Sequence, residues 1–180
     1  MGPVDHFARF GLPRGYAVDR KALDRAYERL SFQYHPDLLA AAPQEERQRA
    51  QQASADVNEG YRILTQDAER AAYLLSLLAK ETLPPGAKLN TEALPPGFLQ
   101  EMFLLQEEVE EASSGDPAGL AALRKQVEVR REKTLTERAA LFGTQPDAAN
   151  LQAIQSNLNQ EKYLLRLLER LNGSNPGAAL

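Results

Sequence analysis

The amino-acid sequence predicts an all-α protein, for three reasons. Ala, Leu, Glu, Gln and Arg, which are strong helix formers, dominate its 180 residues. β-branched residues are few, and no stretch alternates apolar and polar side chains over the length of a strand. Apolar residues recur instead at steps of three and four, and at 43% of the chain they suffice to form a core.

The overall composition excludes several classes of protein. With 25 Asp and Glu against 21 Lys and Arg, the formal net charge of −4 argues against a broad basic surface for nucleic acid. No cysteine is present to build a disulfide framework, a zinc finger or a thiol nucleophile. The longest apolar runs fit no membrane span, and the N-terminal residues do not resemble a secretory signal. We therefore expect a cytoplasmic protein with no membrane or nucleic-acid partner.

The first half of the chain is predicted to form an antiparallel helical hairpin. Its first helix begins after Asp19, a typical N-cap residue. It ends near His35, because Pro36 disfavours helical dihedrals at the residue before it. After a polar loop, the second helix starts near Gln44. The stripes that would pack the hairpin together are Leu23, Tyr27, Leu30 and Tyr34, and then Val57, Tyr61 and Leu64. Two short helices are predicted to flank it, over residues 4–10 and 68–80.

A change of composition then divides the chain. Residues 83–97 carry two Pro-Pro-Gly triplets around a short polar stretch, which is typical of a linker. The alternative is a long loop inside one domain. Three further helices are predicted over residues 96–112, 117–142 and 147–171, and their short connections favour a three-helix bundle. The expected organisation is a first domain over 1–82, a linker over 83–97, a three-helix domain over 98–172 and a frayed tail over 173–180.

The predicted helix over residues 98–112 has two apolar faces. One is a core seam formed by Phe98, Met102, Leu105, Val109 and Ala112. At about 100° per residue, Leu99, Phe103 and Leu104 lie well off that seam. The polar residues that project on the same outer side are Gln100, Glu107 and Glu111. An exposed apolar patch with a polar rim often marks a partner surface. The alternative is that a neighbouring helix wraps around and buries Leu99 and Phe103.

The last helix repeats this pattern. Its predicted seam is Leu151, Ile154, Leu158, Leu165 and Leu168. Tyr163 and Leu167 are predicted to point elsewhere, although a wide core stripe competes with that interpretation.

The second candidate site is the tripeptide formed by His35, Pro36 and Asp37. The histidine can donate or accept a hydrogen bond, the proline fixes the turn, and the aspartate is an acceptor-only anion that could pair with an arginine of a partner. Taken alone the tripeptide is weak evidence, and an ordinary surface turn is the alternative.

The surrounding residues resemble a known domain. Residues 27–37, YERLSFQYHPD, resemble the second helix and loop of a J-domain, and residues 57–64, VNEGYRIL, resemble its third helix. Residues 70–77, RAAYLLSL, are similar to the HscB family, the J-type co-chaperones of iron–sulfur cluster assembly. Residues 98–108, FLQEMFLLQEE, resemble that family's scaffold-binding helix. The resemblance covers roughly residues 5–171 and implies a J-domain followed by a three-helix bundle.

The resemblance implies two partners. A J-domain docks on an HscA/DnaK-type chaperone and stimulates its ATP hydrolysis. The residues implied for that contact are His35, Pro36 and Asp37, with Lys21, Arg25 and Arg29 on the preceding helix. The C-terminal bundle of the family binds an IscU-type iron–sulfur scaffold protein. The residues implied there are Leu99, Gln100, Phe103, Leu104, Glu107, Glu111 and Tyr163.

Another function stays open: a general J-domain co-chaperone or helical adaptor for other clients, with no iron–sulfur role. Glu28 and Gln33 stand where many general J-domains carry lysine, which favours a dedicated chaperone. No enzyme motif is found, and although His6 and His35 could share a metal ion, no third ligand is specified. We expect a monomer with no cofactor, no metal and no catalytic residue.

Overall fold

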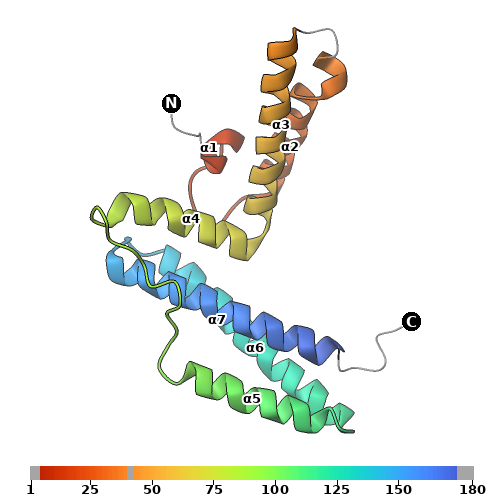
Figure 1. Cartoon of the computed structure of the whole chain (residues 1–180), viewed down its shortest axis with the longest axis vertical. Helices are drawn as coiled ribbons and strands as arrows, with labels where there is room; N and C mark the ends of the chain where they lie inside the picture. Colours follow the sequence, from red (N-terminus) through yellow and green to blue (C-terminus); the bar gives the residue numbers. More distant parts are fainter. Residues whose placement is uncertain (1–4, 40–42, 174–180) are drawn as a thin grey trace. The chain divides into compact units, whose positions relative to one another are not determined.

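The computed structural model describes residues 5–39 and 43–173, and every regular element in them is helical. The all-α prediction is confirmed. The chain divides into two compact units, Met1–Ser76 and Leu77–Leu180. Figure 1 labels their helices along the chain. Within the described residues, no helix combines the length and the apolar character that a membrane span requires.

The first unit is built on a helical hairpin. Its elements are α1 (His6–Phe10), α2 (Arg20–Gln33), the 3-10 helix η1 (Pro36–Leu39), α3 (Gln44–Thr65) and the start of α4 (Asp67–Thr82). Asp19 caps α2 as predicted, since its carboxylate accepts from the backbone N–H of Ala22 at 3.1 Å. The polar loop expected after α2 begins with η1, which was not predicted from the sequence. Residue 4, predicted to start the first helix, lies outside the described residues.

The hairpin is closed by an apolar seam and a tyrosine pair. α2 and α3 lie side by side (Figure 1). Of the predicted stripes, Leu23, Val57 and Leu64 are fully buried. Leu30 and the three tyrosines are half-buried, and the hydroxyls of Tyr27 and Tyr61 reach polar partners. Tyr27 and Tyr61 stack with ring centroids 4.0 Å apart, and the hydroxyl of Tyr61 donates to Asp24 at 2.8 Å.

Residues of the 70–77 segment tie the rest of the first unit to the hairpin. Arg70 donates to the carbonyl oxygens of Tyr16 and Leu64, at 2.9 and 2.8 Å. The Tyr73 hydroxyl accepts from the backbone N–H of His6 at 2.9 Å. The loop before α2, the end of α3 and the first turn of α1 are therefore all fixed by α4.

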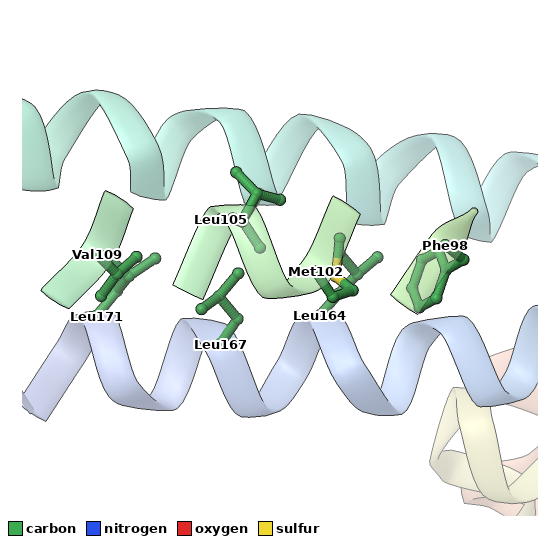
Figure 2. Packing of buried hydrophobic residues seen from close by; sticks show 8 residues of the cluster. Phe98, Met102, Leu105, Val109, Leu164, Leu167 and Leu171 are labelled. Carbon is green, nitrogen blue, oxygen red and sulfur yellow. The ribbon is translucent and has the colours of Figure 1, made fainter. Parts of the chain in front are cut away.

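The second unit is organised around three longer helices: α5 (Phe98–Ala112), α6 (Pro117–Phe142) and α7 (Ala148–Gly173). All five residues predicted for the α5 seam are buried. Figure 2 shows four of them meeting three leucines of α7, Leu164, Leu167 and Leu171.

The prediction for Leu167 was wrong. This residue was expected to point away from the core, but only 6% of it is exposed and it packs in the α5–α7 cluster. Leu165 and Leu168, assigned to the seam, are half-buried. The reason is that α7 packs against α5, α6 and the 90–93 segment, so its buried arc is wider than a single seam.

A buried ion pair lies between α6 and α7. Arg138 is fully buried, and its guanidinium lies 2.6 Å from the Glu161 carboxylate. Arg131 reaches the same carboxylate at 3.0 Å. Asn157 accepts from Nε of Arg138 at 3.0 Å and donates to the carbonyl oxygen of Thr134 at 2.9 Å. Each charge is therefore compensated inside the bundle, which a buried pair requires.

The proline-rich segment before α5 is fastened to α7. The side chain of Gln152 accepts from the backbone N–H of Asn90 at 2.8 Å and donates to its carbonyl at 3.0 Å. Asn159 donates to the carbonyl oxygens of Thr91 and Ala93 at 2.8 and 3.0 Å. This segment belongs to the second compact unit. Its independence as a linker between domains stays a prediction.

Candidate protein-interaction sites

The tripeptide of His35, Pro36 and Asp37 lies where α2 gives way to η1. The backbone N–H of Asp37 donates to Nδ1 of His35 at 3.2 Å, which places the proton of the neutral ring on Nε2. The His35 and Asp37 side chains are 52% and 87% exposed, and Nδ1 lies 3.7 Å from the Asp37 carboxylate. No lysine or arginine of the described residues pairs with that carboxylate. It is therefore open to a cation of a partner. The side chain of Pro36 lies outside the described part of the chain.

Three of the basic residues of α2 form an uncompensated row. Lys21, Arg25 and Arg29 are exposed, and none has an acidic partner among the described residues. Other arginines of this unit are paired, as Arg9 is with Asp56 at 2.9 Å. Steps of four put the three cations on one face of α2. The row therefore presents positive charge along the helix that leads to His35.

Two exposed apolar residues near the tripeptide were not anticipated. Phe32 is 70% exposed and Leu38 is 55% exposed. Phe32 lies three residues after Arg29 and is therefore on the same face of α2 as the basic row. The helical period of α2 places this residue on the face opposite Leu23, so the sequence does carry a signal for its exposure. Leu38 lies in η1, whose turn gives no periodic signal.

The outer face of α5 is exposed. Leu99, Phe103 and Leu104 are 55%, 62% and 57% exposed. No helix of the described chain buries them, so the alternative of a wrapped neighbour does not hold. Gln100, Glu107 and Glu111 are also exposed on this side. The face therefore has apolar residues beside a polar and acidic border.

Ion pairs divide the acidic residues of α5 into two groups. Glu101 pairs with Arg130 of α6, with Oε2 2.6 Å from Nη2, and Glu110 pairs with Arg170 of α7 at 3.1 Å. Glu107 and Glu111 make no ion pair with any described residue. Glu101 and Glu110 are thus tied to neighbouring helices, while Glu107 and Glu111 on the outer face, like Glu108, have no cationic partner among the described residues.

Tyr163 lies at the edge of this face. It is 36% exposed, and its ring packs edge-on against Phe98 of α5, with centroids 5.8 Å apart. The structure thus brings this residue of α7 next to the first turn of α5.

In the described residues, no group of three or more His, Asp or Glu side chains is gathered as a metal site.

Two family models match the chain in the order of its two units. The DnaJ domain matches residues 5–73, and the HSCB C-terminal oligomerisation domain matches residues 94–172. Together with the helical hairpin and its tripeptide, these matches define a J-domain protein with a second helical domain. The chain belongs to the HscB family of co-chaperones. This is the family indicated by the sequence, the J-type co-chaperones of iron–sulfur cluster assembly.

Individual relatives extend over nearly the whole chain. A co-chaperone protein HscB homolog of Cupriavidus taiwanensis is 38% identical over 167 residues, covering 91% of this chain and 89% of the relative. The structure of chaperone HscB from Vibrio cholerae matches with a TM-score of 0.74 and 28% identity, covering 93% and 95% of the two chains. The human co-chaperone protein HscB shares the fold, with a TM-score of 0.76 at 21% identity over 95% of this chain and 82% of its own.

Proposed function

We propose that the protein binds an IscU-type iron–sulfur scaffold, delivers it to an HscA/DnaK-type chaperone and stimulates ATP hydrolysis by that chaperone. One observation carries this proposal. A single chain exposes two unlike sites, a basic row ending in an open carboxylate on one unit and an apolar, acid-bordered helix face on the other. In this proposal the chaperone carries out the ATP hydrolysis. The protein itself acts as a cytoplasmic monomer.

The site for the chaperone is the α2 row with the tripeptide. Lys21, Arg25 and Arg29 complement an acidic surface, and opposite charge chiefly raises the encounter rate and the specificity. Asp37 accepts hydrogen bonds from an arginine of the chaperone, a charge-assisted contact that fixes geometry. His35 supports this contact because its Nδ1 accepts a hydrogen bond from the backbone N–H of Asp37, which orders the turn.

The site for the scaffold is the outer face of α5. Leu99 and Phe103 serve as the apolar anchors, because they are large, exposed and one helical turn apart. The residues proposed to surround them are Gln100, Leu104, Glu107, Glu111 and, on α7, Tyr163. A border of polar and acidic groups around apolar anchors is the usual anatomy of a protein interface.

Joining the two sites in one chain raises the effective concentration of scaffold and chaperone for each other. The proposal therefore predicts synergy: the scaffold should increase stimulation beyond what either protein achieves alone. A co-chaperone for general clients would not show this dependence on the scaffold.

The test is the steady-state ATPase rate of an HscA/DnaK-type chaperone. It is measured with this protein, with an IscU-type scaffold, and with both. Asp37→Asn should keep the fold and scaffold binding but abolish stimulation. Glu46→Gln, at an exposed acid of α3, is the matched control and should stimulate like the wild type. Stimulation that persists in Asp37→Asn contradicts the chaperone site, and stimulation independent of the scaffold favours a general co-chaperone.

A further inference from the structure

A groove of about 290 Å³ runs between α5 and α7. Met102 and Leu167, which are 8% and 6% exposed, contribute its apolar base. The other residues that line it are Gln106, Tyr163, Arg166 and Arg170. The groove thus joins an apolar base to a wall that is largely basic and is supplied by α7.

Arg166 is the cation of this groove that is free to bind an anion. Its guanidinium lies 5.9 Å from the centroid of the Tyr163 ring, and no acid among residues 5–39 and 43–173 pairs with it. Arg170, one turn further along α7, is already paired with Glu110 at 3.1 Å. An arginine stacked on a ring keeps its charge and its N–H donors for a ligand.

The groove adjoins the exposed face of α5. At about 100° per residue, Leu99 and Phe103 lie only roughly 20° and 60° round the helix from Gln106, which lines the groove. Glu107 and Glu111 lie farther round, at roughly 100° and 140° from Gln106. Glu110 lies at roughly 40°, between Leu99 and Phe103, where its carboxylate is paired with Arg170. The order across the surface is therefore a basic edge on α7, a row that exposes Leu99 and Phe103, and an edge of unpaired acidic residues.

We propose that this groove binds an aspartate or glutamate side chain of the scaffold, with Arg166 as its ion-pair partner. The inference rests on the proposed function and adds the chemistry of one contact. A scaffold surface that covers Leu99 and Phe103 can place a carboxylate against Arg166 in one orientation. The reversed orientation would bring that carboxylate toward Glu107 and Glu111, where like charges repel. Arg166 is therefore a determinant of docking orientation.

The test is calorimetric titration of an IscU-type scaffold into the full chain at low and at moderate salt. Arg166→Gln should weaken binding about threefold, the range of an exposed ion pair. Arg166→Glu should weaken it roughly tenfold, because it replaces attraction by repulsion. Arg166→Gln should also reduce the dependence of affinity on salt, and Arg166→Glu should reverse the contribution of this contact, because salt screens repulsion as it screens attraction. Lys125→Gln, at an exposed lysine of α6 with no ion pair among the described residues, is the control and should leave both quantities unchanged.

Three outcomes would overturn the inference. If Arg166→Gln binds like Lys125→Gln while Phe103→Ala still weakens binding, the groove does not hold a carboxylate and the proposed function stands. If Phe103→Ala also has no effect, the proposed scaffold site itself fails. If light scattering shows that Arg166→Glu disrupts a dimer of this chain with scaffold affinity unchanged, the occupant of the groove is a second copy. Melting curves by circular dichroism verify that each variant is folded.

Discussion

Gly60 and His6 are in direct contact: a Cβ built on Gly60 would lie 2.8 Å from Nδ1 and 3.2 Å from Cγ of the His6 ring. Phe10 would approach the same Cβ at 3.0 Å. α1 thus rests on α3 at a position that leaves no room for a side chain. This contact explains a glycine in the middle of a helix, where it otherwise costs about 0.5–1 kcal/mol relative to alanine.

Gly60→Ala should therefore destabilise the first unit, although alanine favours a helix. Overpacking a tight contact costs about 1–3 kcal/mol, which exceeds the gain in helix propensity. The measurement is the free energy of unfolding in urea. Gly173→Ala is the control, because a Cβ on Gly173 meets nothing within 4 Å; its stability should be unchanged or slightly raised. A stabilised Gly60→Ala variant would show that α1 can move away from α3.

His6 should make stability depend on pH near neutrality. Burial, followed by the charge of Arg9, lowers the pKa of His6 from its ordinary value of 6.5. The folded state thus binds a proton less readily than the unfolded state. The contribution of His6 to stability is complete above pH 6.5 and is lost as the pH falls through the pKa of His6 in the folded state. In urea unfolding at pH 7.5 and 5.5, His6→Gln should show a smaller difference between the two values than the wild type.

The carboxylates change stability at a lower pH than His6 does, so the two contributions to the pH dependence can be separated. The hydrogen bond from Tyr61 lowers the pKa of Asp24 from 3.8, and the hydrogen bond from Arg62 lowers the pKa of Glu59 from 4.5. Their stabilisation is present above these ordinary values and is lost below them. A pH dependence between 7.5 and 5.5 that His6→Gln does not reduce would contradict the assignment to His6.

The two faces of α5 should separate binding from stability. Leu99→Ala with Phe103→Ala should weaken scaffold binding by about 1–3 kcal/mol for each anchor, with little change in melting temperature. Leu105→Ala should do the opposite, because Leu105 is only 5% exposed and truncating a buried leucine costs about 2–5 kcal/mol. Calorimetry measures scaffold affinity and thermal unfolding measures stability, on the same samples. A large loss of stability in the double variant would mean that the outer face is part of a core.

Breaking the buried ion pair of the second unit should be costly. Arg138→Met leaves the Glu161 carboxylate, 3% exposed, with only the half-exposed Arg131 as its cation. Removing one partner of a buried pair typically costs about 3–5 kcal/mol. Replacing both residues, as Arg138→Met with Glu161→Leu, should recover most of this loss in urea unfolding. Equal stability of the single and double variants would show that the pair is not coupled.

The fold was predictable wherever the core follows a helical period. All five seam residues of α5 were found in this way, because α5 buries one narrow stripe. The same reasoning failed for Leu167, because α7 packs against α5, α6 and the 90–93 segment and therefore buries a wider arc. The outer face of α5 was predictable from the same helical period: Leu99, Phe103 and Leu104 lie off the seam, and no helix of the described chain covers them.

Polar burial was not predictable. Arg138 and Glu161 are both charged, and a pattern of apolar residues assigns such side chains to the surface. The bonds from Gln152 and Asn159 to the segment before α5 join a side chain to backbone 62–68 residues away, and no local sequence feature specifies them. The turn η1 beside the tripeptide was missed because one turn of 3-10 helix has no period to detect.

The two ion pairs of α5 hold the helix at opposite edges, Glu101 to Arg130 on α6 and Glu110 to Arg170 on α7. The buried seam and these two ion pairs together oppose rotation of α5 about its own axis. The exposed face that we propose for the scaffold is therefore held in one orientation by contacts within the bundle. Docking of a scaffold on this face would then cost mainly side-chain rotamer entropy of this chain, so more of the contact free energy remains as affinity.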